Sequence, residues 1–480
     1  MSEKIPVNVQ LKDKKRVIRL EYDTGLPFFA SLSEKLAEEG VAFSLCGGKG
    51  ICGKCRIRFL QNAPMPGLVE RNFLTPEELR NGIRLACMTR PVKACEIEVL
   101  FAQDTGVITA FGKQEAYVAE GKTDGEPVQT PNTGQESPLF AADVGTTTIA
   151  MARVGSVSGA VEETFSCMNP QSVYGSDVLA RITAAGEVGG RKLQEVVLSS
   201  LEKGIRQLQT NTTQSVYVAA NTVMNHFLAG SDAAGLGKEP FCPEFLSEKK
   251  VYTKFAELVL LPGISAFVGG DITAGLLSCK MLPLSKTDRG MLFLDLGTNG
   301  EMVLSDGQTL FCSAAAAGPA FEGKSSANRG SHMVHFLAEL LRSGQMDETG
   351  LLHIPEEESP ITQKEIRDLQ MAKAAVRTGI EVLLQKAGMR YRDLQRVWLA
   401  GGFGYYIAVE DAVTIGLIPG EFAEITVPVG NAALRGAAVY AGLTEEERNL
   451  LEASLRSDCV AVNLAKEEYF QKHYVEAMNF

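Results

Sequence analysis

The sequence lacks three features that would place it in common protein classes. It has no excess of positive charge, since 58 Asp and Glu against 47 Lys and Arg give a net charge of −11, and no basic tract with interleaved aromatics, so we expect no nucleic acid partner. It has no apolar h-region at its start and no run long enough for a bilayer, so we expect a cytoplasmic protein with no membrane partner. Four of its ten cysteines fall between positions 46 and 87, which argues against a disulfide framework.

The negative charge is unevenly distributed along the chain. Residues 1–100 carry 16 Lys and Arg against 12 Asp and Glu, a net charge of +4, which leaves −15 on the other 380 residues. A basic N-terminal region of this kind is either a solvated face or a docking surface, for an acidic partner or for the acidic body of the same chain.

The first motif in the sequence is a glycine-rich loop that contains three cysteines. Three cysteines follow the spacing C-x5-C-x2-C, and a fourth comes after 31 further residues: Cys46, Cys52, Cys55 and Cys87. The first gap is one residue longer than in plant-type ferredoxins, and the pattern resembles the [2Fe–2S] ferredoxins of the adrenodoxin type. A zinc site normally pairs two C-x2-C knuckles, and only one is present. The pattern therefore predicts one [2Fe–2S] cluster, with Cys95 as a buried strand thiol.

The segments around this loop follow the order of a ferredoxin-like β-grasp domain, which we expect over residues 1–101. They are a hairpin, a helix, a strand, a short helix capped at Thr75, and a closing strand: Val7–Leu11 with Arg16–Tyr22, Pro27–Gly40, Arg56–Leu60, Pro76 onward, and Glu96–Phe101. Periodicity then fades and Gly, Thr, Gln, Glu and Pro dominate, so residues 102–138 are predicted to be a flexible linker.

A repeated motif opens the second part of the chain. An apolar strand ends at Asp143 before a polar turn, and the same design recurs 152 residues later at Asp295. The turn residues are Gly145, Thr146, Thr147 and Thr148 in the first copy and Gly297, Thr298, Asn299 and Gly300 in the second. Gly N–H groups and hydroxyls suit a phosphate, and each aspartate at a strand end suits Mg²⁺ or its bound water.

A third element is a strand at Arg396–Ala400 that ends in Gly401, Gly402, Phe403 and Gly404. The three elements in this order resemble the acetate kinase, sugar kinase, Hsp70 and actin superfamily of ATPases. The resemblance implies an actin-like (ribonuclease H-like) ATPase domain of two lobes over 139–480, with two phosphate loops, an adenosine motif at 401–404, and bound ATP and Mg²⁺. It also implies catalytic roles for Asp143 and Asp295, and lobe-connecting helices that begin near Gly269–Gly275 and Gly430–Gly436.

Other segments carry weaker signals. Thr362 and Glu365 form a capping box that predicts a long helix with one buried face. The polar segment Asn221–His226 follows an apolar strand, so it is expected at the cleft or at a partner surface. His226 is more often a structural histidine than a catalytic one. For Glu322 a surface carboxylate and a site residue remain open.

Taken together, a [2Fe–2S] domain fused to an actin-like ATPase, with the Asp-Leu-Gly-Thr-Asn-Gly-Glu and Asn-Thr-x-Met-x-His segments, resembles the reductive activators of corrinoid proteins over the whole chain. The resemblance implies reduction of Co(II) to Co(I) with ATP hydrolysis. The partners it implies are a corrinoid protein of a methyltransferase system of the O-demethylase type and a cellular low-potential reductant. Because little sequence separates the linker from Asp143, we expect the middle domain of larger members to be absent. Formation of a homodimer is left open.

Other functions compete with this interpretation. Three alternatives are an ATP-driven electron donor to another low-potential enzyme, a metabolite kinase with a regulatory cluster, and a non-catalytic ATP-gated binding module. Product analysis separates these functions, because a kinase yields a phosphorylated metabolite whereas an activator yields free phosphate together with electron transfer.

Overall fold

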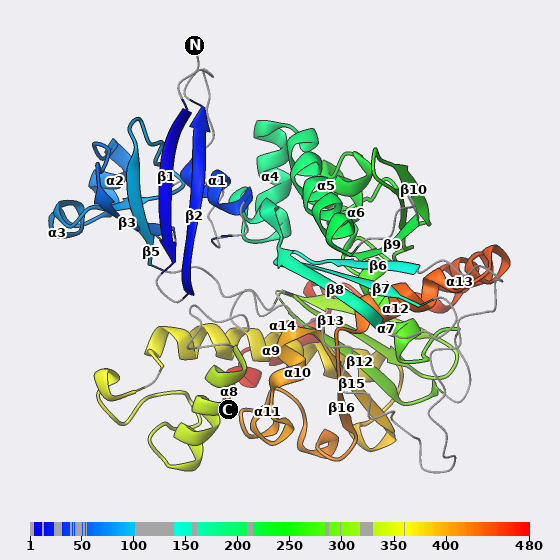
Figure 1. Cartoon of the computed structure of the whole chain (residues 1–480). Coiled ribbons are helices and arrows are strands. Elements are labelled where there is room, and N and C mark those ends of the chain that lie inside the picture. The colour runs from blue at the N-terminus through cyan, green and yellow to red at the C-terminus, as the bar shows by residue number, and fades with distance from the viewer. Residues whose placement is uncertain are drawn as a thin grey trace.

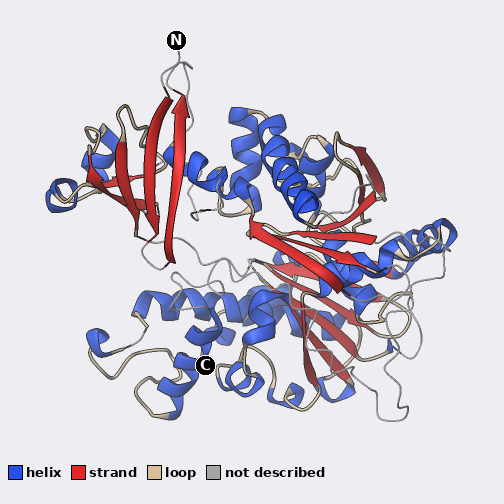
Figure 2. Cartoon of the chain, viewed as in Figure 1, coloured by secondary structure: helices blue, strands red, loops and turns tan. Residues whose placement is uncertain are grey.

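The computed structural model describes residues 4–11, 14–23, 31–38, 41, 43, 50, 53, 55–100, 139–155, 161–208, 215–283, 288–297, 299–316, 330–359 and 361–480. These residues build a ferredoxin-like domain followed by two lobes, which we call lobe I (139–283) and lobe II (288–480) (Figures 1 and 2). The predicted linker lies outside the described residues. None of the described helices has the length and apolar character that a membrane span requires.

The ferredoxin-like domain is a five-stranded sheet in the order β2-β1-β5-β3-β4. Its first strand pairs antiparallel with the second and parallel with the fifth, as in a β-grasp domain. The expected hairpin is confirmed, and so is the short helix with a Thr75 capping box and Pro76 at its first turn. The elements are β1 (Lys4–Leu11), β2 (Lys14–Asp23), α1 (Leu32–Glu38), β3 (Arg56–Gln61), α2 (Leu68–Phe73), α3 (Pro76–Arg80), β4 (Ile83–Leu85) and β5 (Cys95–Val99).

Each lobe contains one six-stranded sheet, and the two sheets share their central topology. Lobe I has the order β10-β11-β9-β6-β7-β8 and lobe II the order β16-β15-β12-β13-β14-β17. In both, three consecutive antiparallel strands are joined by a later strand that lies parallel to the first of them. The strands are β6 (Leu139–Val144), β7 (Thr148–Val154), β8 (Val161–Met168), β9 (Ser215–Ala220), β10 (Lys249–Tyr252), β11 (Glu257–Leu260), β12 (Met291–Leu296), β13 (Gly300–Ser305), β14 (Leu310–Ala315), β15 (Arg396–Ala400), β16 (Thr426–Gly430) and β17 (Cys459–Ala461). The internal repeat predicted from the two aspartates therefore corresponds to the same central strand arrangement in both lobes.

Helices cover these sheets. Lobe I has η1 (Pro170–Val173), α4 (Val178–Val188), α5 (Gly190–Gln207), α6 (Thr222–Ala229), η2 (Ala234–Leu236) and α7 (Gly270–Ser278). Lobe II has α8 (Gly330–Arg342), η5 (Glu356–Glu358), α9 (Gln363–Lys386), η6 (Tyr391–Asp393), α10 (Gly401–Tyr406), α11 (Val409–Thr414), η7 (Gly420–Phe422), α12 (Ala432–Ala441), α13 (Glu445–Asp458), η8 (Leu464–Lys466), α14 (Glu468–His473) and η9 (Glu476–Met478). The long helix α9 begins at the predicted Thr362 capping box, and its predicted apolar face is buried.

The two lobes meet where α7 and α12 cross. A Cβ placed on Gly436 of α12 would lie 1.7 Å from the carbonyl oxygen of Ala274 in α7, so only glycine allows the two backbones to come this close. A Cβ on Gly275 would lie 2.4 Å from the ring of Phe293 in β12. These contacts belong to a core of small and aliphatic residues drawn from both sheets. The two expected connecting helices are therefore confirmed at the interface of the lobes.

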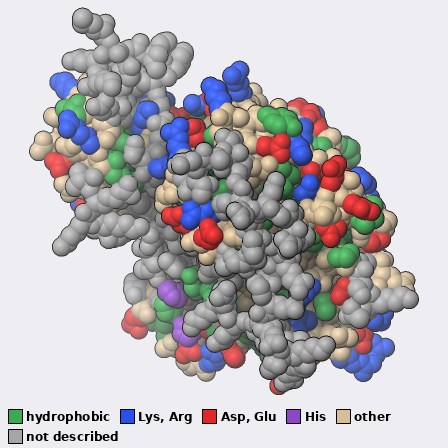
Figure 3. Space-filling view, turned by 45° about the vertical axis from the view of Figure 1, so that its right-hand side comes forward, with side chains coloured by type: hydrophobic (Ala, Val, Ile, Leu, Met, Phe, Trp, Pro, Cys, Tyr) green, Lys and Arg blue, Asp and Glu red, His purple; other side chains and the backbone are tan. Residues whose placement is uncertain are grey.

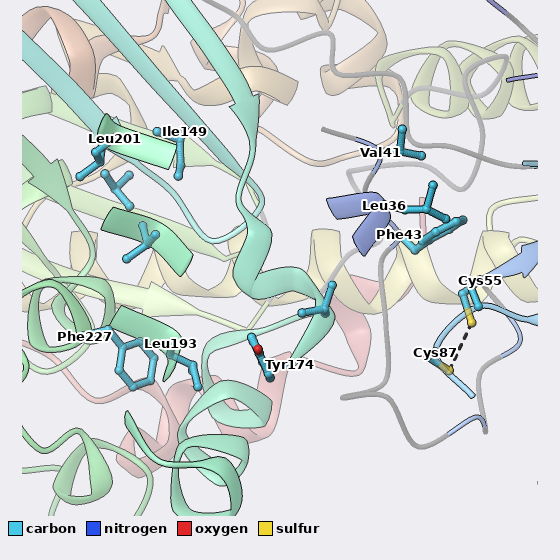
Figure 4. Close-up of a cluster of buried hydrophobic side chains, with 14 of the residues drawn as sticks. Leu36, Val41, Phe43, Cys55, Cys87, Ile149, Tyr174, Leu193, Leu201 and Phe227 are labelled. Atoms are coloured by element: carbon cyan, nitrogen blue, oxygen red, sulfur yellow. Dashed lines mark hydrogen bonds between the residues drawn. The ribbon is translucent and has the colours of Figure 1, made fainter. Parts of the chain in front are cut away.

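The ferredoxin-like domain contacts lobe I through α1. This helix lies against η1, and the hydroxyl of Tyr174 donates a hydrogen bond of 3.5 Å to Oε1 of Glu34. Figure 4 shows Leu36 and Phe43 on one side of this boundary and Tyr174 on the other. All three belong to one cluster of buried apolar side chains that continues from the ferredoxin-like domain into lobe I. The two bodies thus share an apolar contact.

Replacing Gly436 with alanine should separate α7 from α12. We expect Gly436→Ala to lower the free energy of unfolding by about 3 kcal/mol, because the added methyl group overlaps a backbone carbonyl that cannot move without the helix. Gly186→Ala in α4 is the matched control, since nothing lies within 4 Å of the Cβ it adds. That control should be neutral or stabilising by up to ~1 kcal/mol. Thermal unfolding of the two variants measures the difference, and equal melting temperatures would contradict the close crossing.

Candidate functional site

The first polar turn forms a compact loop at the end of β6. The backbone N–H of Gly145 donates to the carbonyl of Thr148 at 2.9 Å, which closes the turn between β6 and β7. Its outer backbone is held by side chains of lobe I. Asn169 donates from Nδ2 to the carbonyl of Gly145 at 2.8 Å, and its backbone N–H donates to the carbonyl of Thr147 at 2.8 Å. The backbone of the loop is therefore tied to Asn169 of lobe I.

Two further side chains hold the same loop through Thr146. Arg181 of α4, which is fully buried, donates to the carbonyl oxygen of Thr146 and also bonds Gly175 and Gln171. Asn221 donates from Nδ2 to the Thr146 hydroxyl at 3.1 Å, while its Oδ1 accepts from the N–H of Met224 and so caps α6. Asn221, the first residue of the polar segment, thus contacts the first polar turn. This agrees with the expected position at the cleft and not with the alternative at a partner surface.

His226, from the same segment, is a structural residue. Its ring is fully buried and stacks on Phe245 at 4.6 Å between ring centroids. Nδ1 lies 2.7 Å from the carbonyl of Thr222, and Nε2 accepts the N–H of Glu244 at 3.0 Å. Nδ1 therefore carries the proton, and burial lowers the pKa of the ring, so the histidine is neutral and fully engaged.

The second turn occupies the equivalent position in lobe II. Asp295 and Glu301 lie directly opposite each other on the antiparallel pair β12 and β13. Gly297 donates its N–H to the carbonyl of Asn299 at 2.9 Å within the turn. Thr298, predicted here as a phosphate contact, lies outside the described residues, and so does Glu322.

The glycine motif at 401–404 starts helix α10 beside this turn. Gly401 has φ +84°, and a Cβ on it would lie 2.4 Å from Oδ1 of Asp295 and 2.6 Å from the carbonyl of Leu296. Glycine is therefore required both by the left-handed backbone and by the space beside the aspartate. The motif and the second turn, far apart in sequence, are thus in contact.

One hydrogen bond joins the two copies of the repeat. Asn431, from lobe II, donates from Nδ2 to Oδ2 of Asp143 in lobe I at 2.9 Å. The Oδ1 of the same asparagine accepts the N–H of Leu434 at 2.7 Å and caps α12. The start of the connecting helix is therefore fixed directly on the first aspartate.

Four carboxyl groups converge between the lobes, and burial raises the pKa of each. Burial raises the pKa of Asp143 to about 7, although the hydrogen bond from Asn431 acts to lower it. Burial, together with the charges of Asp271 and Asp143, raises the pKa of Asp295 to about 7. The pKa of Asp271 rises to about 6, and that of Glu301 lies well above its usual range. Mutual repulsion in a poorly solvated cleft favours protons or a cation there.

This set of oxygen ligands fits a hard cation held partly by a nucleotide. Among the described residues no three His, Cys, Asp or Glu side chains lie close enough to hold a metal ion by themselves. Mg²⁺ usually keeps several waters and takes one or two carboxylates, with phosphates completing its shell. Asp143 and Asp295, each beside a polar turn, are therefore compatible with Mg²⁺ that enters with ATP.

The cysteine loop is described in part. The sulfurs of Cys55 and Cys87 lie 3.3 Å apart and are buried (Figure 4), and the bond with Cys87 lowers the pKa of the Cys55 thiol. Gly50 and Gly53 both have positive φ, as a loop that turns its N–H groups inward requires. Two converging thiols, of which Cys55 has a lowered pKa, fit a metal cluster. Cys46 and Cys52 lie outside the described residues.

Cys95 does not join these thiols. It lies in β5 with 6% of its surface exposed, and burial raises its pKa to about 11. The prediction of a buried strand thiol is confirmed.

Three family models match the chain. The 2Fe-2S iron-sulfur cluster binding domain matches residues 30–92, the RACo middle region matches 140–283, and the C-terminal ASKHA domain of RACo matches 289–332 and 341–480. The chain belongs to the RACo family. The predicted fold class, with a ferredoxin-like domain before an actin-like unit, is confirmed. The expectation that a middle domain is absent is wrong, because lobe I itself matches that region.

Individual relatives agree with this family. The corrinoid activation enzyme RamQ of Eubacterium limosum is 25% identical, over 92% of this chain and 95% of that protein. The [Co(II) methylated amine-specific corrinoid protein] reductase of Methanosarcina barkeri is 22% identical, over 49% of this chain and 54% of its own. The solved structure of a reductive activator for a corrinoid, iron-sulfur protein aligns with a TM-score of 0.64 and 25% identity, over 99% of this chain and 98% of the other.

The raised pKa values predict how stability depends on pH. A carboxyl whose folded pKa is raised stabilises the fold while protonated, so the nucleotide-free, metal-free protein should lose stability as pH rises through 6 to 7. Asp295→Asn removes one such group. We expect the variant to gain about 1–3 kcal/mol relative to the wild type between pH 5.5 and pH 8.

Melting temperatures at the two pH values test this expectation. Glu447→Gln is the matched control, because hydrogen bonds from Thr444 lower the pKa of Glu447 and its charge is constant over this range. Its difference from the wild type should not change with pH. A wild-type melting temperature that rises between pH 5.5 and pH 8 relative to Asp295→Asn would contradict the buried acid cluster.

Proposed function

We propose that this chain is an ATP-dependent reductive activator of a corrinoid protein, which reduces Co(II) to Co(I) with an electron carried by its [2Fe–2S] domain. The observation that carries the proposal is the contact of a [2Fe–2S] domain with the lobe that contains the first polar turn. Both are present in one chain that matches RamQ over nearly its full length. An electron carrier joined to an ATPase is suited to an acceptor that is hard to reduce.

In this proposal the two polar turns hold the phosphates of ATP. Asp143 and Asp295 are the catalytic residues, one organising Mg²⁺ and the other orienting the attacking water, since each ends a strand beside a Gly-containing turn. The glycines at 401–404 let the adenosine approach bare backbone beside Asp295. Asp271 and Glu301, whose pKa values burial raises, can lose their protons when a cation enters, which favours Mg²⁺ bound together with the phosphates.

Cys46, Cys52, Cys55 and Cys87 are proposed as the cluster ligands. Of these, Cys55 and Cys87 already place their sulfurs side by side. The bound [2Fe–2S] cluster supplies a one-electron carrier with a potential near roughly −400 mV in the plant-type class. Among the described residues of this region, Gly50, Gly53, Cys55 and Cys87 are buried, which keeps water away from the two described thiols.

The nucleotide site and the ferredoxin-like domain communicate through one short segment. Asn169 holds the first phosphate loop, the next residues form η1 against α1, and Tyr174 bonds Glu34. A change in the loop on binding ATP therefore displaces the surface on which the ferredoxin-like domain rests. Coupling of this kind typically provides about 1–3 kcal/mol, whereas each ~100 mV of uphill electron transfer costs about 2.3 kcal/mol.

The proposed partners are a corrinoid protein of an O-demethylase type methyltransferase system and a cellular low-potential reductant. Two relatives are named for corrinoid activation and for reduction of a methylated-amine corrinoid protein, which supports the first partner as a class. The chain is proposed to act in the cytoplasm, and a homodimer would double the number of sites without altering any of them.

An anaerobic assay tests the proposal. With a Co(II) corrinoid protein, ATP, Mg²⁺ and a reductant, the corrinoid absorption spectrum should convert to that of Co(I), and free phosphate should accumulate. Asp295→Ala should lower the ATP-dependent rate by about 100-fold or more, because it removes a preorganised charge from the hydrolytic site. Cys55→Ser should abolish reduction while leaving nucleotide binding intact.

Two results would contradict the proposal. One is Co(I) formed equally fast without nucleotide or by folded Asp295→Ala. The other is ATP consumed only when a small metabolite is added and becomes phosphorylated, which would favour a kinase. Gly186→Ala serves again as a folded control that leaves the site untouched.

A further inference from the structure

The ferredoxin-like domain exposes an unusual group of apolar side chains. Met65 is 84% exposed, Leu68 75% and Val92 63%, which makes them among the most exposed large hydrophobic residues of the described chain. Large apolar side chains at this exposure cost solvation free energy, and grouped together they mark an interaction surface. We call Met65, Leu68 and Val92 the outer patch.

Hydrogen bonds place these three residues on one surface. The coil before α2 runs beside the coil before β5, since Asn62 Nδ2 donates to the carbonyl of Ala94 at 2.8 Å, and it also contacts β4, since Arg84 Nε donates to the carbonyl of Pro64 at 2.9 Å. Glu70 of α2 accepts the N–H of Leu85 at 2.9 Å and the hydroxyl of Thr89 at 3.3 Å. Met65 and Leu68 lie on the first of these segments and Val92 on the second.

The outer patch borders the cysteine loop. Val92 follows the ligand candidate Cys87 by five residues. A Cβ on Gly50 of the loop would lie 2.7 Å from Val69, the neighbour of Leu68, and 2.9 Å from Met88. One layer of side chains therefore separates the loop from the patch. Electron transfer requires short distances, so a surface this near the loop suits a redox partner.

Basic side chains surround the patch. Arg71 on α2 and Lys93 beside Val92 are both exposed, whereas the neighbouring carboxylate of Glu70 is buried and fully hydrogen-bonded. Figure 3 shows hydrophobic and basic side chains next to each other on this domain. Residues 1–100 carry +4 and the rest of the chain −15, so an acidic protein is attracted to this domain and repelled by the lobes.

The patch also lies away from the contact with lobe I. Figure 1 shows α1 on the side of the sheet that faces α4, and α2 at the opposite end of the domain. A protein on the patch therefore does not compete with the contact of α1 and η1. This arrangement suits the protein that delivers electrons to the domain while it rests on lobe I.

We propose that the outer patch is the docking surface for an acidic, low-potential electron-carrier protein, an inference that rests on the proposed role of the cluster as an electron carrier. In the transfer, the reduced carrier loses one electron and is oxidised, and the oxidised [2Fe–2S] cluster gains that electron. An apolar centre with a charged rim is typical of small, transient redox interfaces, in which charge accelerates encounter and apolar contact fixes orientation.

The test uses an acidic bacterial 2[4Fe–4S] ferredoxin as the probe. Binding of the oxidised probe to the full-length protein is measured by calorimetry, and cluster reduction by the reduced probe is followed by stopped-flow absorbance, both without ATP or corrinoid protein. Met65→Ser with Leu68→Ser should weaken binding about tenfold without changing charge. Lys93→Glu should slow cluster reduction about tenfold at low salt, and the difference should fall as salt rises.

The matched control is Arg19→Glu. Arg19 is exposed on β2, the strand at the opposite edge of the sheet from β4, and carries the same charge change. It should leave both readouts near wild type, and an unchanged visible spectrum confirms that every variant keeps its cluster. The proposal is overturned if the patch variants bind and react like wild type, or if Arg19→Glu slows reduction as much as Lys93→Glu.

A third result would assign the patch to the corrinoid protein. In that case the patch variants would bind the probe and accept its electron like wild type but fail to reduce Co(II), and the proposed docking of a carrier would be wrong. Because probe binding and cluster reduction are measured without ATP or a corrinoid protein, a failure of the proposed function would leave these two readouts unaffected.

Discussion

Helices α7 and α12 cross with Gly436 so near the carbonyl of Ala274 that no side chain fits between them, and this contact sets the spacing of the two lobes. It brings Asn431, at the start of α12, onto Asp143, and it holds the carboxyls of Asp143 and Asp295 within electrostatic reach of each other. Burial raises the pKa values of these carboxyls, and for Asp143, Asp295 and Glu301 the charges of the other carboxyls raise them further. A ligand that neutralises the cluster therefore favours one relative position of the lobes, which is how a nucleotide can act on the shape of the whole unit.

The segment from Asn169 to Tyr174 extends this effect to the electron carrier. A single asparagine satisfies the backbone of the first polar turn and caps η1, and η1 in turn supports α1. The ferredoxin-like domain thus rests on a part of lobe I that is also bonded to this turn. Since the apolar contact is continuous and the hydrogen bond to Glu34 is long, the domain is positioned by packing more than by a strong polar bond.

The sequence predicted those parts of the molecule that local patterns determine. Strand ends with Gly-containing turns identified Asp143 and Asp295, cysteine spacing identified the ferredoxin loop, and capping residues identified α3 and α9. It did not assign Asp271 or Glu301 to the acid cluster, because their positions depend on helix crossing and on strand register. Glycines before Asp271 pointed only to a helix start. The roles of Asn169 and Arg181 were missed for the same reason, since both act on a loop more than twenty residues away in sequence.

ATP binding and hydrolysis are proposed to drive the electron from this chain to a corrinoid. A single-turnover experiment tests it most directly: the cluster is reduced with one electron, excess reductant is removed, and the protein is mixed with a Co(II) corrinoid protein with or without ATP. The account predicts that the paramagnetic resonance signals of the reduced cluster and of Co(II) disappear together when ATP is present and persist when it is absent. Equal loss of both signals without ATP would contradict it.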